Sequence, residues 1–315
     1  MSKKRINAYL LLLLVSVIWG AASPIVKYAL TWFHPVIFLT YRFFLSSIIA
    51  LIIFGAEPAT FPKKARDKSL AFLTMMLSTP IALGLFFLGL SKTSALSGSL
   101  ITAGAPILLV AAGALFLHER VSNTEKVGIV ITIIGTFMIA IGPLVFNNTA
   151  NHFGTLEGNL IMVLATIADL SATLFTKICM DRGISLRLLA HGQFVLGLII
   201  FLPILLLRHP IVSIAATVVD APWSAHAAVW FMALISGSLA YTLRDHGLRW
   251  VEVSEAAIFT YLQPIWAAIL SILWLGEPIT TSYIIGGGIL TLGVCISEYR
   301  GKRVPAVVHR RHKRK

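Results

Sequence analysis

The strongest constraint on this chain is that it contains the same segment twice. Residues 82–139 (the first copy) and 240–297 (the second copy) align without a gap at a constant offset of 158 positions. Residues with special backbone behaviour recur at equivalent places, since Thr102 and Pro106 reappear as Thr260 and Pro264. An internal duplication of this length predicts two similar halves around a shared central site.

Composition places the chain in a membrane. Hydrophobic residues make up 57% of it and charged residues 12%, with a mean hydropathy of +0.86. A helical span needs roughly 20 apolar residues to cross about 30 Å of hydrocarbon, and continuous rather than alternating runs predict helices, not a barrel. The sequence therefore predicts an all-α integral membrane fold with ten transmembrane helices. These runs lie at about 7–28, 34–56, 68–90, 95–117, 124–144, 155–177, 187–207, 226–246, 253–275 and 281–299.

Positive charges predict how these helices are oriented. Lysine and arginine gather in alternate connections, and the other connections are nearly without them. Cytoplasmic loops carry such an excess, so both termini are expected in the cytoplasm, here beside a bacterial-type inner membrane. The basic connections are the N-terminus, 57–69, 118–126, 177–187, the loop with Arg249, and the tail from Arg300.

The two halves are predicted to have opposite orientations. The first covers residues 6–144 and the second covers 155–299, with five spans in each. Because five is odd, the second half enters the membrane inverted relative to the first, as in many secondary transporters.

The formal charge of +13 does not require a nucleic-acid partner. The basic tail at 300–315 is expected to set the topology and to lie against anionic lipid, with RNA or DNA binding as the alternative. Cys179 and Cys295 both fall near predicted cytoplasmic ends, so no disulfide is predicted.

Several motifs carry a resemblance to a known family. They are Trp19-Gly20, the Tyr41-Arg42-Phe43 triplet, and two modules, Pro106 to Glu119 and Pro264 to Glu277, each followed by a glycine-rich helix. As a set, over about 6–299, they resemble the ten-helix, EamA-type members of the drug/metabolite transporter superfamily. The resemblance implies a secondary transporter with alternating access, often an exporter of amino acids or other small metabolites. The run Leu243-Arg244-Asp245-His246 departs from the family, whose members usually have a neutral or aromatic-polar run there.

A proline in each copy predicts a bend halfway along a span. Pro106 and Pro264 have no N–H to give to the carbonyls of Thr102 and Thr260, and free carbonyls at that depth need protein or water beside them. We therefore expect both points to face a shared cavity and to act in gating. The alternative is that the threonine hydroxyls only repair their own kinks. The first and third spans are expected to bend similarly at Pro24 and Pro80.

Few ionisable residues lie within the predicted spans, and Asp169 in the sixth is the most central. A charge at the bilayer centre costs at least about 2.5–3.5 kcal/mol on insertion scales, so it normally faces a partner or a wet cavity. We expect Asp169 to contact a substrate amine or to carry a coupling proton. The alternative is a structural ion pair with Arg42 or Arg244. The Arg244-Asp245 pair belongs either to the site or to a cytoplasmic gate.

Other polar and aromatic side chains in the spans suit an amphipathic small molecule. They offer aromatic walls, a few hydrogen bonds, and rings over which an ammonium could lie, with ordinary packing as the alternative for each. The predicted binding residues besides Asp169, Arg42 and Arg244 are Trp19, Ser23, Phe86, Thr102, Thr173, Tyr241, Thr260, Tyr261 and Gln263.

Glu119 and Glu277 recur at the same place in the two copies. Each follows one helix and precedes the next, where a carboxylate can interact with free N–H groups, so we interpret both as structural. The recurring glycines that follow, such as Gly128 and Gly286, predict close helix contact, either within a monomer or between the protomers of a homodimer.

Enzyme motifs are absent from the sequence. It contains neither H-E-x-x-H nor G-x-x-x-x-G-K-[ST], and its histidines show no ligand spacing, so no metal or cofactor is predicted. A lipid or lipid-linked headgroup flippase is the nearer alternative to a metabolite carrier, because Arg42 or Arg244 could attract a phosphate. An intramembrane enzyme is the more distant one.

Overall fold

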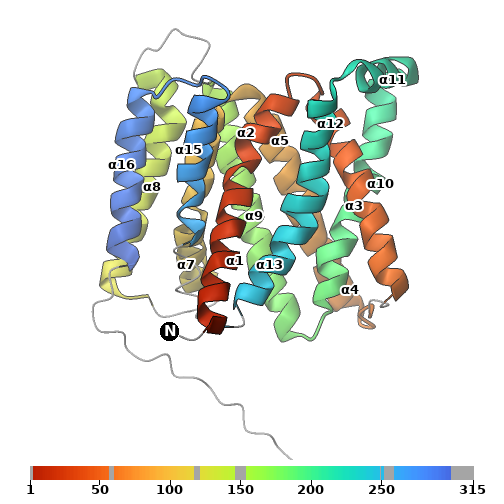
Figure 1. Ribbon diagram of the computed structural model, residues 1–315. Coiled ribbons are helices and arrows are strands. Elements are labelled where there is room, and N and C mark those ends of the chain that lie inside the picture. The colour runs from red at the N-terminus through yellow and green to blue at the C-terminus, as the bar shows by residue number, and fades with distance from the viewer. Residues whose placement is uncertain are drawn as a thin grey trace, which may run out of the picture.

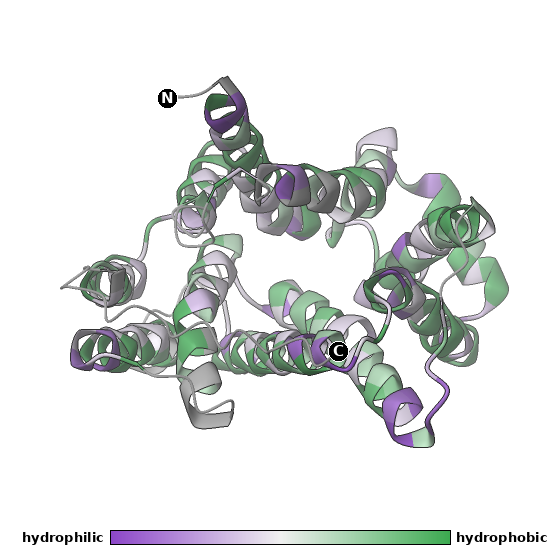
Figure 2. Ribbon diagram, turned by 90° about the horizontal axis from the view of Figure 1, so that it is seen from below, coloured by the Kyte–Doolittle hydropathy of each residue, from purple (hydrophilic) through white to green (hydrophobic). Residues whose placement is uncertain are grey.

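The protein is a helical bundle. The computed structural model describes residues 3–56, 60–116, 121–145, 154–248, 250–251 and 259–298, and these contain helices and no strands. Figure 2, which looks along the bundle, shows hydrophobic residues over most of every helix, as expected of a protein solvated by lipid.

The helices of the first half follow the predicted runs closely. Two runs are interrupted, and a third contains a π-helical segment around the buried Pro80. The elements are α1 (Lys3–Gly20), α2 (Ala22–Ala29), α3 (Pro35–Ala56), α4 (Ala65–Met76), η1 (Leu77–Leu83), α5 (Gly84–Lys92), α6 (Ala95–Ala103), α7 (Ala105–Phe116) and α8 (Asn123–Val145).

The helices of the second half include one short helix that no predicted run contains, α11. Like the first half, the second half contains a π-helical segment within one run. The elements are α9 (Leu156–Asp181), α10 (Leu186–Arg208), α11 (Ile211–Asp220), α12 (Trp223–Trp230), η2 (Phe231–Leu239), α13 (Ala240–Leu248), α15 (Gln263–Leu273) and α16 (Thr281–Glu298).

The chain is an all-α integral membrane protein. In the described part, 7 helices are long and apolar enough to cross a membrane, or up to 8 if a bent pair counts as one span. Two further apolar helices, Gln263–Leu273 and Thr281–Ser297, are shorter. The number of ten spans stays a prediction.

The bundle has two distinct edges. In Figure 1, α8 and α16 lie together at one edge, α3 and α10 lie at the other, and α1, α9, α13 and α15 stand between them. The main apolar core contains the fully buried rings of Phe38, Phe43 and Phe87, from α3 and α5.

Helices α8 and α16 touch through their backbones. A Cβ atom on Gly135 would lie 2.5 Å from the backbone nitrogen of Leu290, and one on Gly293 would lie 2.6 Å from that of Thr132. Gly135 also faces the carbonyl of Gly286, and Gly293 faces that of Gly128, so the two helices are antiparallel. These recurring glycines therefore serve contact within one chain.

Glu277 joins the second copy to the start of α6. Its carboxylate accepts hydrogen bonds from the N–H groups of Ala95 (2.7 Å) and Leu96 (2.9 Å), which have no partner within the helix. Burial raises the pKa of the Glu277 carboxyl, against the opposing effect of these N–H groups and of Lys27. The predicted structural role fits this geometry, although the helix that Glu277 caps is α6 and not the one that follows it. Glu119 lies outside the described residues.

Substituting Gly135 tests the contact between α8 and α16. We expect Gly135→Ala to lower the midpoint of thermal unfolding in detergent, because the new methyl group overlaps the Leu290 backbone and overpacking costs about 1–3 kcal/mol. Gly288→Ala on α16 is the matched control, since a Cβ there meets nothing within 4 Å. Equal midpoints for the two variants would show that the helices are not in backbone contact.

The pH dependence of stability tests the environment of Glu277. Because its pKa is raised on folding, Glu277 favours the folded state most below its unfolded pKa, and this contribution is lost as the pH rises through the folded pKa. We expect the unfolding midpoint of the wild type to fall across that window, and to fall less in Glu277→Gln. Glu157→Gln, which alters an exposed carboxylate paired with Lys92, should keep the wild-type profile. A profile of Glu277→Gln that matches the wild type would contradict the assignment.

Candidate functional site

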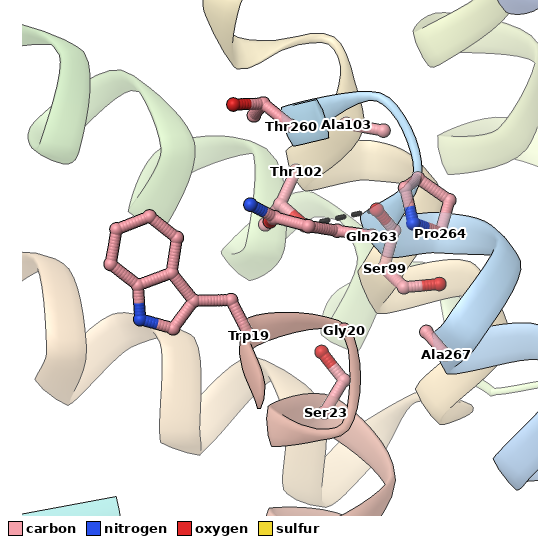
Figure 3. A pocket seen from close by; sticks show the side chains of 10 residues that line it. All are labelled: Trp19, Gly20, Ser23, Ser99, Thr102, Ala103, Thr260, Gln263, Pro264 and Ala267. Carbon is pink, nitrogen blue, oxygen red and sulfur yellow. Dashed lines mark hydrogen bonds between the residues drawn. The ribbon is translucent and has the colours of Figure 1, made fainter. Parts of the chain in front are cut away.

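A small cavity lies between α1, α2, α6 and the start of α15. Its volume is about 40 Å³, which corresponds to roughly three water molecules. Figure 3 shows the lining residues that these helices contribute, with the ring of Trp19 turned away from the others. They are Trp19, Gly20, Ser23, Ser99, Thr102, Ala103, Thr260, Gln263, Pro264 and Ala267.

Three interrupted helices meet at this cavity. Helix α1 ends at Gly20 and α2 begins at Ala22, while α6 ends at Ala103 and α7 begins at Ala105. Helix α15 begins at Gln263, directly after a turn at residues 261–262. The breaks are local, because backbone hydrogen bonds continue across them, from the N–H of Ile25 to the carbonyl of Ala21 (3.1 Å) and from the N–H of Leu108 to the carbonyl of Gly104 (3.1 Å).

Each of the paired prolines follows a short irregularity in its helix, at Gly104 for Pro106 and at residues 261–262 for Pro264. Pro106 and Pro264 are each the second residue of their helix, α7 and α15. A proline is tolerated in the first turn because its missing N–H would have had no partner there. The bends at both prolines stay a prediction, and Pro264 lines the cavity.

The Thr102 hydroxyl does not repair the break beside it. Its Oγ1 donates to the carbonyls of Gly98 (3.1 Å) and Ser99 (3.0 Å), in the turn before the break. Thr260, its counterpart in the second copy, also lines the cavity. The two threonines therefore lie on one shared cavity.

Gly20 allows α1 to reach α15. A Cβ atom at this position would lie 2.6 Å from Cβ of Trp266 and 2.7 Å from the carbonyl oxygen of Gln263. The Trp266 indole also donates to the hydroxyl of Ser16, at 3.1 Å. The contact between α1 and α15 closes one side of the cavity.

Trp19 connects the cavity to the second half of the chain. Its Nε1 donates to the carbonyl of Ser236 in η2, at 3.0 Å. The guanidinium carbon of Arg244 lies 5.6 Å from the centre of its ring, a cation–π distance. Arg244 therefore contacts the ring of Trp19 and does not itself line the cavity. The side chains of Tyr241 and Asp245, which are on the same helix, lie outside the described part.

Asp169 and Thr173 share one face of α9, away from the residues that line the cavity. The Thr173 hydroxyl donates to the Asp169 carbonyl, at 3.0 Å. The Asp169 side chain is exposed, in the middle of the helix. The ion pairs of the described part include Lys92 with Glu157 and Arg182 with Asp67. The alternative of a structural pair between Asp169 and Arg42 or Arg244 stays a prediction.

The remaining predicted residues lie away from the cavity. Arg42 is buried in α3, with its guanidinium carbon 5.8 Å from the Phe87 ring, and Phe86 packs against the same ring. Tyr261 packs against the main core. Pro24 is buried in α2, and Pro80 is buried in η1.

The cavity also contains residues that the sequence analysis did not predict as binding residues. These residues are small, which allows another helix to approach closely. They are Gly20, Ser99, Ala103 and Ala267. The one available signal was spacing, because Ser99 and Ala103 lie one helical turn apart beside Thr102. No group of three or more histidine, cysteine or acidic side chains in the described part could hold a metal ion.

Comparisons with known proteins agree with this architecture. A solved crystal structure aligns with a TM-score of 0.64 at 13% identity, over 95% of this chain and 98% of the other. An uncharacterized transporter of Bacillus subtilis, YyaM, is 24% identical over 92% of this chain and 93% of its own length. A probable terminal-alkyne amino-acid exporter of Streptantibioticus cattleyicolor is 22% identical over 92% of each chain.

The family comparison covers nearly the whole chain. The model of the EamA-like transporter family matches residues 6–141 and again residues 156–299. Together with the helical membrane fold, these two matches show that the chain belongs to the EamA-like transporter family.

Proposed function

We propose that this transporter exports a small amphipathic metabolite, for example an amino acid, by alternating access as a secondary carrier. The observation that carries the proposal is the cavity where interrupted helices from both halves of the chain meet. Interrupted helices near the bilayer midplane are how many secondary transporters build their substrate sites.

The proposal includes two inverted five-helix halves, 6–144 and 155–299, with both termini in the cytoplasm. The contact between α8 and α16 supports it, because Gly128 faces Gly293 while Gly135 faces Gly286. Equivalent residues of the two copies thus meet in a crossed pattern. Such a pattern arises when equivalent helices are related by a two-fold axis that is perpendicular to them.

In the proposed mechanism the cavity is the closed form of the site. Roughly three waters fit, so a substrate enters only when the helices around Gly20 and Gln263 separate on one side of the membrane. Trp19 would transmit this movement, because it is bonded to η2 and stacked under Arg244.

Asp169 is proposed as the main polar determinant, for a substrate amine or a coupling proton. An exposed carboxylate in the middle of a span is costly against lipid, by at least about 2.5–3.5 kcal/mol, so a water-filled opening is its favourable location. The name of the Streptantibioticus relative supports an amino acid as substrate and export as direction.

Counterflow of labelled amino acids in proteoliposomes tests the substrate class and Asp169 together. We expect one class to accumulate in the wild type, and Asp169→Asn to abolish that accumulation or its dependence on an imposed pH gradient. Asp181→Asn, at the exposed end of the same helix, is the matched control and should behave as the wild type. Wild-type behaviour of Asp169→Asn would return Asp169 to a structural role. If no amino acid accumulates, translocation of lipid headgroups is assayed next, since a flippase moves its lipid chemically unchanged.

Removing a helix interruption tests the gating proposal. Pro264→Ala restores an N–H that can bond to the Thr260 carbonyl, so the helix can continue through the turn at 261–262. We expect substrate exchange in the same proteoliposomes to slow by about tenfold, which corresponds to an increase of ~1.4 kcal/mol in the activation free energy. The control is Pro203→Ala, which alters an exposed proline inside α10. Unchanged exchange in Pro264→Ala would make the interruption a detail of packing.

A further inference from the structure

Helix α11 is turned away from the direction of the spans. It is bent by 102° relative to the helix that begins at Trp223, and it starts after Pro210 and ends just before Pro222. Figure 1 shows it lying across one end of the bundle, above α10 and α12. At ten residues it is about 15 Å long, half of what a membrane span needs.

Three kinds of residue occupy three separate sectors of α11. At about 100° per residue, Ile214 and Val218 share one sector, and both pack against the core of the bundle. The Nε2 atom of His226 on α12 lies 3.0 Å from the Val218 carbonyl oxygen. This contact fixes the packing sector of α11 against α12. Ser213, Thr217 and Asp220 form a polar sector whose centre is about 110° from that of the packing sector.

The third sector is apolar and covered by nothing in the bundle. Ile211, Val212 and Val219 are 71%, 81% and 80% exposed. The neighbouring elements continue this surface, since Leu207 at the end of α10 and Trp223 at the start of α12 are 87% and 76% exposed. Leu207 belongs to a predicted span whose exposed side chains face lipid, so the apolar sector is continuous with the lipid-facing surface.

We propose that α11 lies in the interface of the lipid bilayer, on the side opposite the predicted cytoplasmic termini, with Ile211, Val212 and Val219 inserted among the acyl chains. Helices with an apolar and a polar face bind membranes in this way, about 5–10 Å into the boundary between headgroups and chains. The flanking residues suit that depth, because Trp223 is an aromatic of the kind enriched at interfaces and Arg208 can reach the headgroups.

A re-entrant position for α11 fits the structure less well. Its polar sector would then enter hydrocarbon, where Asp220 would be costly and the hydroxyls would lack water. In the interface, the same sector faces water while the packing sector stays on the protein. The lipid surface is therefore the partner that all three sectors accommodate.

Spin labels on adjacent residues test the proposal in liposomes. The exposed Cys295 and the buried Cys179 are first replaced by serine, and a single cysteine is introduced by Val212→Cys or by Ser213→Cys. The two positions are about 100° apart on the helix, so Ser213→Cys is the matched control. We expect the label at position 212 to be relaxed mainly by oxygen, which partitions into lipid. The label at 213 should be relaxed mainly by a water-soluble nickel chelate.

A second pair guards against a local effect of one label. Val219→Cys and Thr217→Cys should repeat the contrast, and both variants should elute as the wild type does in gel filtration. Equal access of nickel to both labels of a pair would overturn the proposal in favour of a helix in water. Screening of the label at 212 from both reagents would indicate a protein partner, such as a second copy. If oxygen relaxes the labels at both 212 and 213 and the nickel chelate relaxes neither, α11 is a re-entrant segment.

Discussion

The backbone contact between α1 and α15 at Gly20 determines how the centre of this protein is built. Because no side chain separates the helices there, the end of α1 meets the start of α15 directly, and the break in α6 completes the cavity. Lipid offers no partner to free backbone groups, so such breaks persist only when they face one another or water. Because α1 and α15 approach each other closely at Gly20, the irregular points of the three helices lie together at one cavity.

Outside the cavity, two charged side chains hold the turn between α5 and α6, and each comes from an element distant in sequence. Lys27 of α2 donates to the carbonyls of Leu90 and Thr93, at the end of α5, while Glu277 accepts from the start of α6. The turn between α5 and α6 is therefore fixed at both helix ends by opposite charges, each matched to the local helix dipole. This arrangement fixes the outer end of α6 and thereby the position of Thr102.

Sequence alone predicted the all-α membrane fold, because hydropathy and helical length are local properties. It also selected Trp19, Ser23, Thr102, Thr260, Gln263 and Pro264, which the structure places on one cavity. It did not predict which helix Glu277 caps, or that small residues such as Gly20 and Ala267 line the cavity. Those features depend on distances between helices, which no single helix encodes. The bends predicted at Pro106 and Pro264 stay predictions, and each proline follows a short irregularity in its helix.

The crossed glycine contacts of α8 and α16 carry an evolutionary consequence. Gly135 of the first copy faces Gly286 of the second, and Gly128 faces Gly293, so each copy supplies the surface that the other needs. A larger residue in one copy would require a change in its partner helix. The two halves of the gene can therefore diverge in what they bind, but not independently at this seam. A single copy expressed alone would leave a groove of bare backbone that only a second copy could fill.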